Sequence, residues 1–154
     1  MEYKTSHHSV YLLTYHVVFV TKYRKPCITD EIGDFMKEYA AYLLEKQGGK
    51  LISAKTDKDH MHILMELLPS TAPADAVKIL KTMLSKECHR RYGDEIEKYI
   101  YGKNSPLWSP SYFIATTGTT VMEKVRDYIN SQRTDDHKRK YEKTGRYSKK
   151  TPKT

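Results

Sequence analysis

Residues 50–67, KLISAKTDKDHMHILMEL, predict two β-strands, KLISAKT and HMHILMEL, joined by a short polar turn. Side chains alternate between the two faces of a strand, so His60 and His62 point the same way while Met61 points into the core. Two imidazoles about 7 Å apart on one face can converge on a single metal ion. Histidines on an exposed sheet are nevertheless ordinary, so the pair needs support from the rest of the chain.

The sequence on either side of this hairpin predicts a strand and two helices. Residues 10–20, VYLLTYHVVFV, are β-branched and aromatic with little helical periodicity, and they predict a long strand. From Asp30, apolar residues recur at helical spacing as far as Gly48–Gly49, a pair that ends a helix well. Residues 74–91 predict a second helix, with apolar residues on one face and basic residues spread around the rest.

The C-terminal part of the chain adds one strand and one helix. Residues 106–117, PLWSPSYFIATT, predict a strand that Pro110 interrupts, at an edge or at a bulge. Gly118 marks a turn, and residues 119–132 predict a final helix. The order β-α-β-β-α-β-α belongs to the α+β class: a ferredoxin-like or RRM-like split βαβ arrangement with an antiparallel sheet and an extra C-terminal helix. This fold hosts many unrelated functions, so it implies none by itself.

The positive charge of the chain gathers at its C-terminal end. The chain carries a formal charge of +8, from 27 basic and 19 acidic residues. Residues 137–154 hold eight of the basic residues and one of the acidic ones, which leaves residues 1–136 near neutral. We therefore expect a folded domain over 1–136 and a basic tail over 137–154. The tail either binds polyanions or keeps the protein soluble, and the sequence leaves both readings open.

The cysteines and the short apolar runs indicate where the protein works. Cys27 and Cys88 lie far apart in no metal-like spacing, so we expect no structural zinc site. With no secretory leader, the two thiols are expected to be reduced, in the cytoplasm. The longest apolar runs fall far short of the ~20 residues that cross a bilayer, so no membrane partner is expected.

Tyr128 and Gln132 are one turn apart on the same face of the expected C-terminal helix. A glutamine carbonyl can join two imidazoles around a divalent ion. A phenol beside that ion would be a nucleophile, because the cation favours its deprotonation and neutralises charge on a phosphate under attack. On spacing alone, a tyrosine packed on the core and a glutamine in solvent explain the same pattern.

Four stretches in this order resemble a known family, the single-tyrosine HUH transposases of small bacterial insertion sequences (the TnpA type). HUH denotes histidine–hydrophobic–histidine, which here is His60-Met61-His62. The resemblance runs from about residue 10 to about residue 133, and only the basic tail falls outside the pattern. The stretches that carry it are YLLTYHVVFVTKYRKP, DKDHMHILMEL, LWSPSYFIATTG and VRDYINSQ.

The resemblance implies a reaction and a role for each site residue. His60 and His62 would bind Mg²⁺ or Mn²⁺, with Gln132 as the third ligand. Tyr128 would attack a phosphodiester of single-stranded DNA, which leaves a 5′-phosphotyrosine on the protein and a free 3′-OH on the DNA. A 3′-OH from another end would then attack that linkage, so strands are exchanged without a nucleotide cofactor.

The resemblance also implies partners. Members of the family are homodimers in which each active site combines the histidine pair of one subunit with the tyrosine helix of the other. They bind single-stranded DNA that is folded into a hairpin at each element end. Gly118 would permit the tyrosine helix to swing, although a simple turn before a helix explains it equally well. Lys22, Arg24 and Lys25 either contact the hairpin phosphates or form a solvated basic loop.

Two other functions remain open from the sequence. A catalytically silent module could bind single-stranded nucleic acid by stacking bases on the many tyrosines of such a sheet. A domesticated relative could cut hairpins in dispersed genomic repeats with the same residues. The combination of Tyr128 with His60, His62 and Gln132 favours a transposase, because a silent module has no use for that set.

Overall fold

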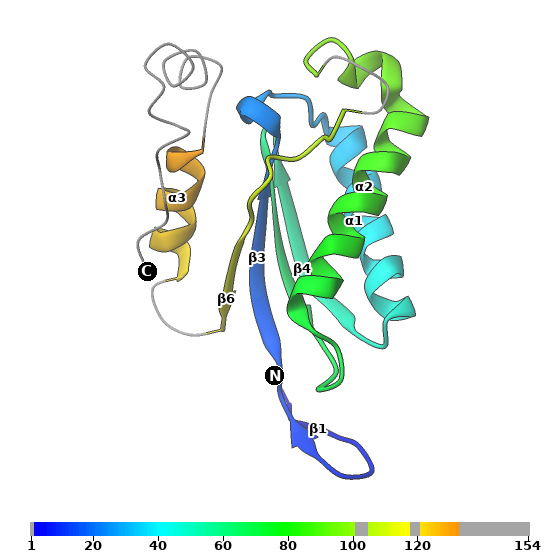
Figure 1. Ribbon diagram of the computed structural model, residues 1–154, viewed down its shortest axis with the longest axis vertical. Helices are drawn as coiled ribbons and strands as arrows, with labels where there is room; N and C mark the ends of the chain where they lie inside the picture. Colours follow the sequence, from blue (N-terminus) through cyan, green and yellow to red (C-terminus); the bar gives the residue numbers. More distant parts are fainter. Residues whose placement is uncertain (1, 101–104, 118–120, 133–154) are drawn as a thin grey trace.

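The protein is a two-sided α+β sandwich in the computed structural model, which describes residues 2–100, 105–117 and 121–132. A four-stranded antiparallel sheet lies at the centre, with α1 and α2 on one side of it and α3 on the other (Figure 1). The helices are α1 (Asp30–Lys46), α2 (Pro73–Ile96) and α3 (Val121–Ser131), and the strands of the sheet are β3 (Thr14–Val20), β4 (Lys50–Asp57), β5 (His60–Glu66) and β6 (Phe113–Thr116).

The order of the strands across the sheet is β4-β5-β3-β6, and every neighbouring pair is antiparallel. The first strand of the sheet in the chain, β3, therefore lies between the third and the fourth. This is the split βαβ topology of the ferredoxin-like fold, so the predicted fold class is confirmed. Because β3 is central, residues on its α3 side face both the histidine strand β5 and the edge strand β6.

The main core lies between the sheet and helices α1 and α2. The hydroxyl of Thr29 caps α1 by accepting a hydrogen bond from the Ile32 amide at 3.2 Å, and Gly48 follows the helix at φ +78°. A smaller cluster, of Val18 and Val20 with Val125 of α3, lies on the opposite face. The largest fully buried side chains are Phe19, Ile32, Met36, Leu44, Met61, Ile63, Met65, Leu67, Leu80, Leu84, Ile96 and Leu107.

Replacing Met61 by alanine is expected to lower the free energy of unfolding by about 2–5 kcal/mol, because its side chain is fully buried and a cavity would remain. Met61→Leu is the matched control, and we expect it to cost less than about 1.5 kcal/mol because it keeps the buried volume. Denaturant unfolding of both variants makes the measurement. Equal stabilities of Met61→Ala and wild type would contradict the placement of this side chain in the core.

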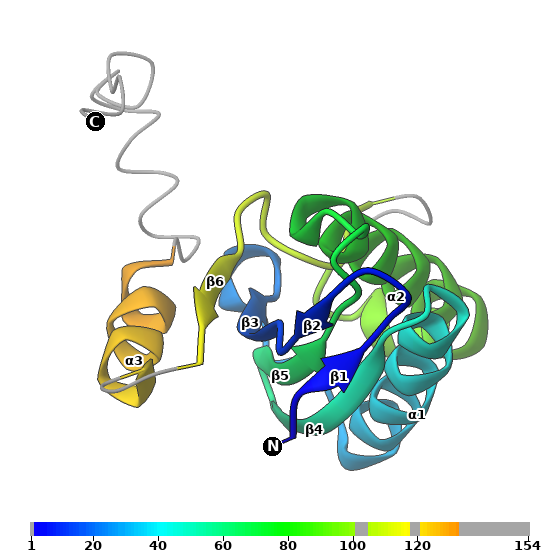
Figure 2. The same cartoon turned by 90° about the horizontal axis from the view of Figure 1, so that it is seen from below.

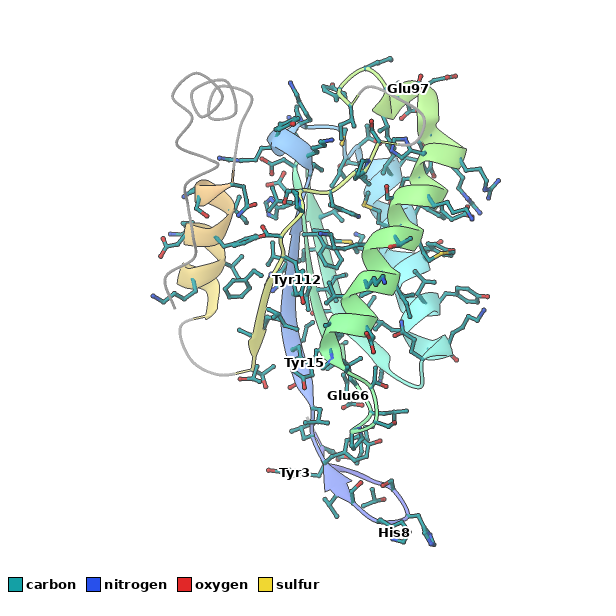
Figure 3. The ribbon with its side chains drawn as sticks, in the orientation of Figure 1. Tyr3, His8, Tyr15, Glu66, Glu97 and Tyr112 are labelled. Atoms are coloured by element: carbon teal, nitrogen blue, oxygen red, sulfur yellow. The ribbon has the colours of Figure 1, made fainter. Side chains whose placement is uncertain are left out.

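The predicted long strand over 10–20 is wrong in one respect, because it is broken at Leu12–Leu13. Residues Val10–Tyr11 form β2, which pairs with β1 (Lys4–Thr5) in a separate hairpin (Figure 2). The reason is the end of the partner strand: β5 stops at Glu66, opposite Thr14, and beyond that pair only one hydrogen bond, from the Leu67 amide to the Leu13 carbonyl at 2.9 Å, continues the ladder. The hairpin, which includes His8, projects beyond the sheet (Figure 3).

The predicted strand over 106–117 is also shorter in the structure. Only Phe113–Thr116 pairs continuously with β3, and Trp108 makes an isolated bridge to Thr21. Between that bridge and the Val18–Phe113 pair, residues 109–112 lie opposite only two residues of β3. This is an edge-strand bulge at Pro110, as the sequence indicated, because a proline has no N–H for the ladder.

Two further predictions concern segment ends. The second helix runs five residues beyond the predicted Arg91, with a break at Tyr92 (φ −126°), because Ile96 still reaches the core. Gly118 and the tail 137–154 lie outside the described residues, so their roles stay predictions. None of the described helices is both long and apolar enough to span a bilayer.

Candidate active site

His60 and His62 lie on one face of β5, opposite the fully buried Met61, as the alternation predicted. In the register with β3, His62 pairs with Val18. His60 pairs with Val20 in the same register, and both valines belong to the cluster under α3. Residues paired directly across an antiparallel sheet share a face. The histidine pair therefore lies on the α3 side of the sheet.

Asp59, the last residue before β5, orients the first histidine. Its Oδ1 accepts a hydrogen bond from Nδ1 of His60 at 2.8 Å, and its Oδ2 lies 3.4 Å from Nε of Arg24. A carboxylate on one imidazole nitrogen fixes the tautomer and leaves the lone pair of the other nitrogen for a cation. Sequence reasoning missed this role, although an acid directly before the histidine was a usable signal.

His16 of β3 contacts the second histidine and was also missed from the sequence. Its Nδ1 lies 3.1 Å from Nε2 of His62, so one ring donates a hydrogen bond to the other. Burial lowers the pKa of His16, and burial followed by the neighbouring His16 and His60 lowers the pKa of His62. Both rings are thus kept neutral near pH 7. The alternation along TYHVVFV places His16 on the face of Val18, but only the pairing with β5 brings it to His62.

Tyr128 and Gln132 extend from α3 to the bulged segment before β6. The Tyr128 ring packs on Phe113, with 5.8 Å between ring centroids, and its hydroxyl lies 2.9 Å from Oγ of Ser111. Oε1 of Gln132 accepts hydrogen bonds from Ser109 and Ser111, both at 3.3 Å. The one-turn spacing seen in the sequence therefore brings both side chains to the same pair of serines.

The protonation of Tyr128 follows from this setting. Burial raises the pKa of its phenol, and the hydrogen bonds with Ser111 and Ser109 oppose that shift. A serine hydroxyl has a single proton. When Ser111 donates that proton to Gln132, the Tyr128 O–H must donate to Ser111. The described arrangement thus holds a neutral phenol with its proton directed at the serine.

The histidine pair and the tyrosine helix share one face of the sheet. Phe113, on which Tyr128 packs, pairs with Val18, and Val18 pairs with His62 on its other side. Phe113 therefore lies in the same row as His62, two strand spacings away, or on the order of 10 Å at the backbone, and the Tyr128 ring packs on Phe113 from α3. The structure puts His60 and His62 together on β5, and it brings Tyr128 and Gln132 together over the edge strand β6 and the bulge before it. The central strand β3 separates the two pairs.

Two of the three candidate metal ligands, His60 and His62, are in a state suited to binding a divalent ion. His60 keeps a directed lone pair through Asp59, and His62 is held neutral, as metal ligation requires. In the described part of the chain, no group of three His, Cys, Asp or Glu side chains could hold a metal ion. A third protein ligand to such an ion would be of another type, and the candidate, the Gln132 carbonyl oxygen, accepts hydrogen bonds from the two serines.

The three basic residues after β3 lie near the histidine pair. Lys22 and Arg24 belong to the 3₁₀ turn η1 (Lys22–Arg24), which Lys25 follows. Tyr23 and Arg24 both adopt a φ of 55°, an uncommon conformation for residues with a side chain. Lys22 lies 5.7 Å from the Tyr23 ring centroid, and Arg24 supports His60 through Asp59. Contact of these residues with DNA stays a prediction.

The strand order and helix arrangement define an α+β protein of the ferredoxin-like class. The family described as "Transposase IS200 like" matches residues 9–132, which include both strands of the histidine hairpin and the whole of α3. The chain belongs to this IS200-like transposase family.

Individual relatives agree with the family. The chain is 30% identical over 132 residues to the ISDra2 transposase TnpA of Deinococcus radiodurans, covering 86% of this chain and 92% of that protein. It is 28% identical over 133 residues to the transposase for insertion sequence element IS200 of Salmonella typhimurium, covering 86% and 85%.

Solved structures show the same fold. The crystal structure of a putative transposase from Deinococcus radiodurans R1 matches with a TM-score of 0.77 and 27% identity, over 85% of this chain and 98% of that one. A REP-associated tyrosine transposase bound to a REP hairpin matches with a TM-score of 0.50 and 13% identity, over 81% and 68%. At that identity the second match supports the fold alone.

Proposed function

We propose that this transposase cleaves and rejoins single-stranded DNA at insertion-sequence ends through a phosphotyrosine at Tyr128. The observation that carries the proposal is the shared sheet face: the Tyr128 hydroxyl, Gln132 and the histidine pair all lie on the α3 side. The other side is filled by α1 and α2. We also propose that this reaction on single-stranded DNA takes place in the cytoplasm.

The proposed cleavage exchanges one phosphate ester for another. The Tyr128 oxygen bonds to the phosphorus, and the bond from phosphorus to the 3′ oxygen of the preceding nucleotide breaks. The phenol proton leaves as the new bond forms, and the departing 3′ oxygen takes up a proton. Because burial raises the pKa of Tyr128, the phenol enters the reaction protonated and its activation is part of the chemistry. Attack by a 3′-OH from another end reverses these bond changes.

We infer that His60, His62 and Gln132 hold the divalent ion, Mg²⁺ or Mn²⁺. Such an ion supplies positive charge at the phosphate and favours the phenolate. To ligate by Nε2, His62 must exchange its hydrogen bond with His16, and Gln132 must leave the hydroxyls of Ser109 and Ser111. We infer that the metal site forms when His62 and Gln132 give up these hydrogen bonds and ligate the ion instead.

Asp59→Asn is expected to weaken Mn²⁺ binding by about 10–100-fold, the usual loss when the partner of a metal-bound histidine is changed. The reason is that an amide no longer holds the His60 tautomer by charge. Electron paramagnetic resonance of Mn²⁺ titrated into the DNA-free protein makes the measurement. Asp34→Asn, at an exposed residue of α1 on the other side of the sheet, is the control with the same loss of charge. Equal losses in the two variants would contradict a specific role for Asp59.

We propose that the DNA partner is a hairpin and that the protein acts as a homodimer with shared sites. A structural neighbour is bound to a REP hairpin, and the likeness of fold makes a hairpin a reasonable ligand here. Exchange of the tyrosine helix between subunits is supported by its limited packing, in which Val125, Tyr128 and Ile129 rest on a small cluster separate from the main core.

A mixture of two inactive variants tests the shared site. In a dimer whose sites combine two subunits, Tyr128→Phe mixed with His62→Ala recovers one intact site in each heterodimer. We expect about half of the wild-type cleavage per heterodimer, because one of its two sites is intact and the other lacks both groups. The measurement is adduct formation after co-refolding the two variants with different tags. An inactive purified heterodimer would instead indicate sites built within one subunit.

Labelled single-stranded DNA tests the proposed function directly. An oligonucleotide spanning a hairpin beside the gene is incubated with the protein and Mn²⁺, and the products are separated in denaturing detergent. With a 3′-end label, a covalent protein–DNA band is expected; with a 5′-end label, a shortened free strand is expected. Tight hairpin binding without either product would overturn the proposal and favour a silent binding module.

A further inference from the structure

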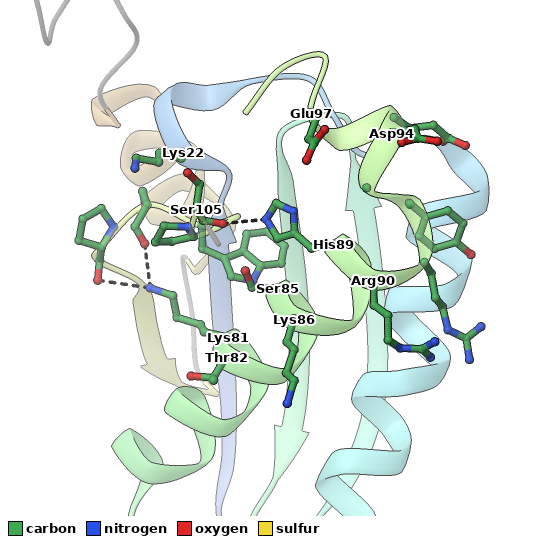
Figure 4. Close-up of a pocket in the computed structure, with 18 residues that line it drawn as sticks. Lys22, Lys81, Thr82, Ser85, Lys86, His89, Arg90, Asp94, Glu97 and Ser105 are labelled. Atoms are coloured by element: carbon green, nitrogen blue, oxygen red, sulfur yellow. Dashed lines mark hydrogen bonds between the residues drawn. The ribbon is translucent and has the colours of Figure 1, made fainter. Parts of the chain in front are cut away.

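One lysine of α2, Lys81, donates hydrogen bonds to the backbone of the bulge at Pro110. Nζ of Lys81 donates to the carbonyl oxygens of Ser109 at 2.8 Å, Pro110 at 3.3 Å and Ser111 at 3.3 Å. Figure 4 shows this side chain reaching from α2 to the segment. An ammonium group has three N–H donors, so three carbonyls can satisfy it completely.

Two of these three residues, Ser109 and Ser111, also make the contacts to Tyr128 and Gln132. While their carbonyls face Lys81, the hydroxyl of Ser111 meets Tyr128 and the hydroxyls of Ser109 and Ser111 meet Gln132. The backbone of the bulge is thus fixed on one side and holds both site residues on the other. Because of the bulge, the carbonyls of these three residues do not bond to the neighbouring strand. Without Lys81 they would lose the hydrogen-bond donor that they have in the structure.

Lys81 differs from the other basic residues around it. It lines a groove of about 1060 Å³ between α2 and residues 105–110, together with the exposed Lys86 and Arg90. Its side chain is partly buried, and burial lowers its pKa. Because its three N–H donors already bond to backbone carbonyls, Lys81 has no free donor for a phosphate.

We propose that Lys81 is a positioning residue of the transposase: it fixes the bulge 109–111 so that Ser109 and Ser111 seat Gln132 and Tyr128. The inference rests on the proposed role of Tyr128 as nucleophile. The hydrogen bonds of Ser109 and Ser111 with Gln132 and Tyr128, which we call the seat, are present without DNA or metal. Lys81 acts through the bulge and touches neither the phosphate nor the attacking oxygen.

Hydrogen–deuterium exchange of residues 121–132 in the DNA-free, metal-free protein tests the seat. We expect α3 to exchange about tenfold faster in Lys81→Met and in Ser111→Ala, the factor that loss of one good hydrogen bond produces. Lys78→Met, on the exposed side of α2 one turn earlier, is the control and should match wild type. Unchanged α3 exchange in both Lys81→Met and Ser111→Ala would overturn the proposal.

Chemical rescue separates positioning from general stability. Lys81→Cys treated with bromoethylamine regains an ammonium of nearly the same length, while iodoacetamide adds a neutral group. The native thiols stay unreactive, because burial raises the pKa of Cys27 to about 11 and the pKa of Cys88 to about 12. We expect only the aminoethylated protein to recover wild-type exchange in α3. Equal recovery with both reagents would overturn the role of the charge.

Kinetics completes the test. Adduct formation by Lys81→Met should show a kcat lowered about tenfold and a KM for hairpin DNA within about twofold of wild type, because the seat affects the nucleophile and not DNA binding. A raised KM with unchanged kcat would mean that Lys81 contacts DNA instead. If wild type forms no adduct at all, the proposed function fails, whereas the exchange experiment still judges the seat.

Discussion

Tyr128→Phe is expected to form no covalent adduct with single-stranded DNA, with a loss of at least about 10⁴-fold in rate, because the attacking oxygen is absent and no other step can replace it. The variant should fold normally, since the ring still packs on Phe113 and only the hydrogen bonds of the hydroxyl with Ser111 and Ser109 are lost. Labelled adduct on a denaturing gel makes the measurement.

The matched control for this variant is Tyr42→Phe. Tyr42 lies on α1, is 53% exposed, and is on the opposite side of the sheet from Tyr128. It should retain the wild-type rate. Hairpin affinity in a native gel should be unchanged in both variants, which separates loss of chemistry from loss of binding. An adduct that persists in Tyr128→Phe would mean that another of the 13 tyrosines is the nucleophile.

His62→Ala is expected to lower Mn²⁺ affinity by at least about a hundredfold, because one of two imidazole ligands is lost. Adduct formation should fall with it, and a large excess of Mn²⁺ should restore part of the rate. Partial recovery at high metal distinguishes a ligand from a residue that merely supports the sheet. Mn²⁺ titration by electron paramagnetic resonance and the adduct gel together make the measurement.

The control for this variant is His8→Ala, since His8 is an exposed histidine in the hairpin beyond the sheet. It should change neither metal affinity nor rate. Unaltered Mn²⁺ binding in His62→Ala would contradict the assignment of the histidine pair as metal ligands. In that case the contact between His16 and His62 would remain as a feature of the sheet without a metal role.

Local patterns were enough to predict most of the elements. The alternation over 60–66 correctly put Met61 inside and the histidines outside, because strand geometry sends neighbouring side chains to opposite faces. Helical spacing and the glycine stop located α1 to within a few residues. The length of the first strand could not be predicted, because it depends on where its partner β5 ends, about fifty residues later.

The sequence predicted some residues of the candidate site but not the residues that contact them. Four of its residues stood out through the H-x-H pair and the one-turn spacing of Tyr128 and Gln132, and the motif order pointed to the family that the comparisons establish. The residues that hold them were not visible. Ser109 and Ser111 looked like part of a strand, and Lys81 looked like one of many basic residues on a helix.

The sequence by itself determined the order of elements and the faces of the strands, and it singled out the candidate site residues, because these follow from periodicities of two and 3.6 residues and from side-chain chemistry. Only the tertiary structure decided what each candidate residue contacts. His16 meets His62 across 46 positions and Lys81 meets Ser109 across 28. Such contacts depend on strand register and on a bulge, and neither leaves a periodic signal in the chain.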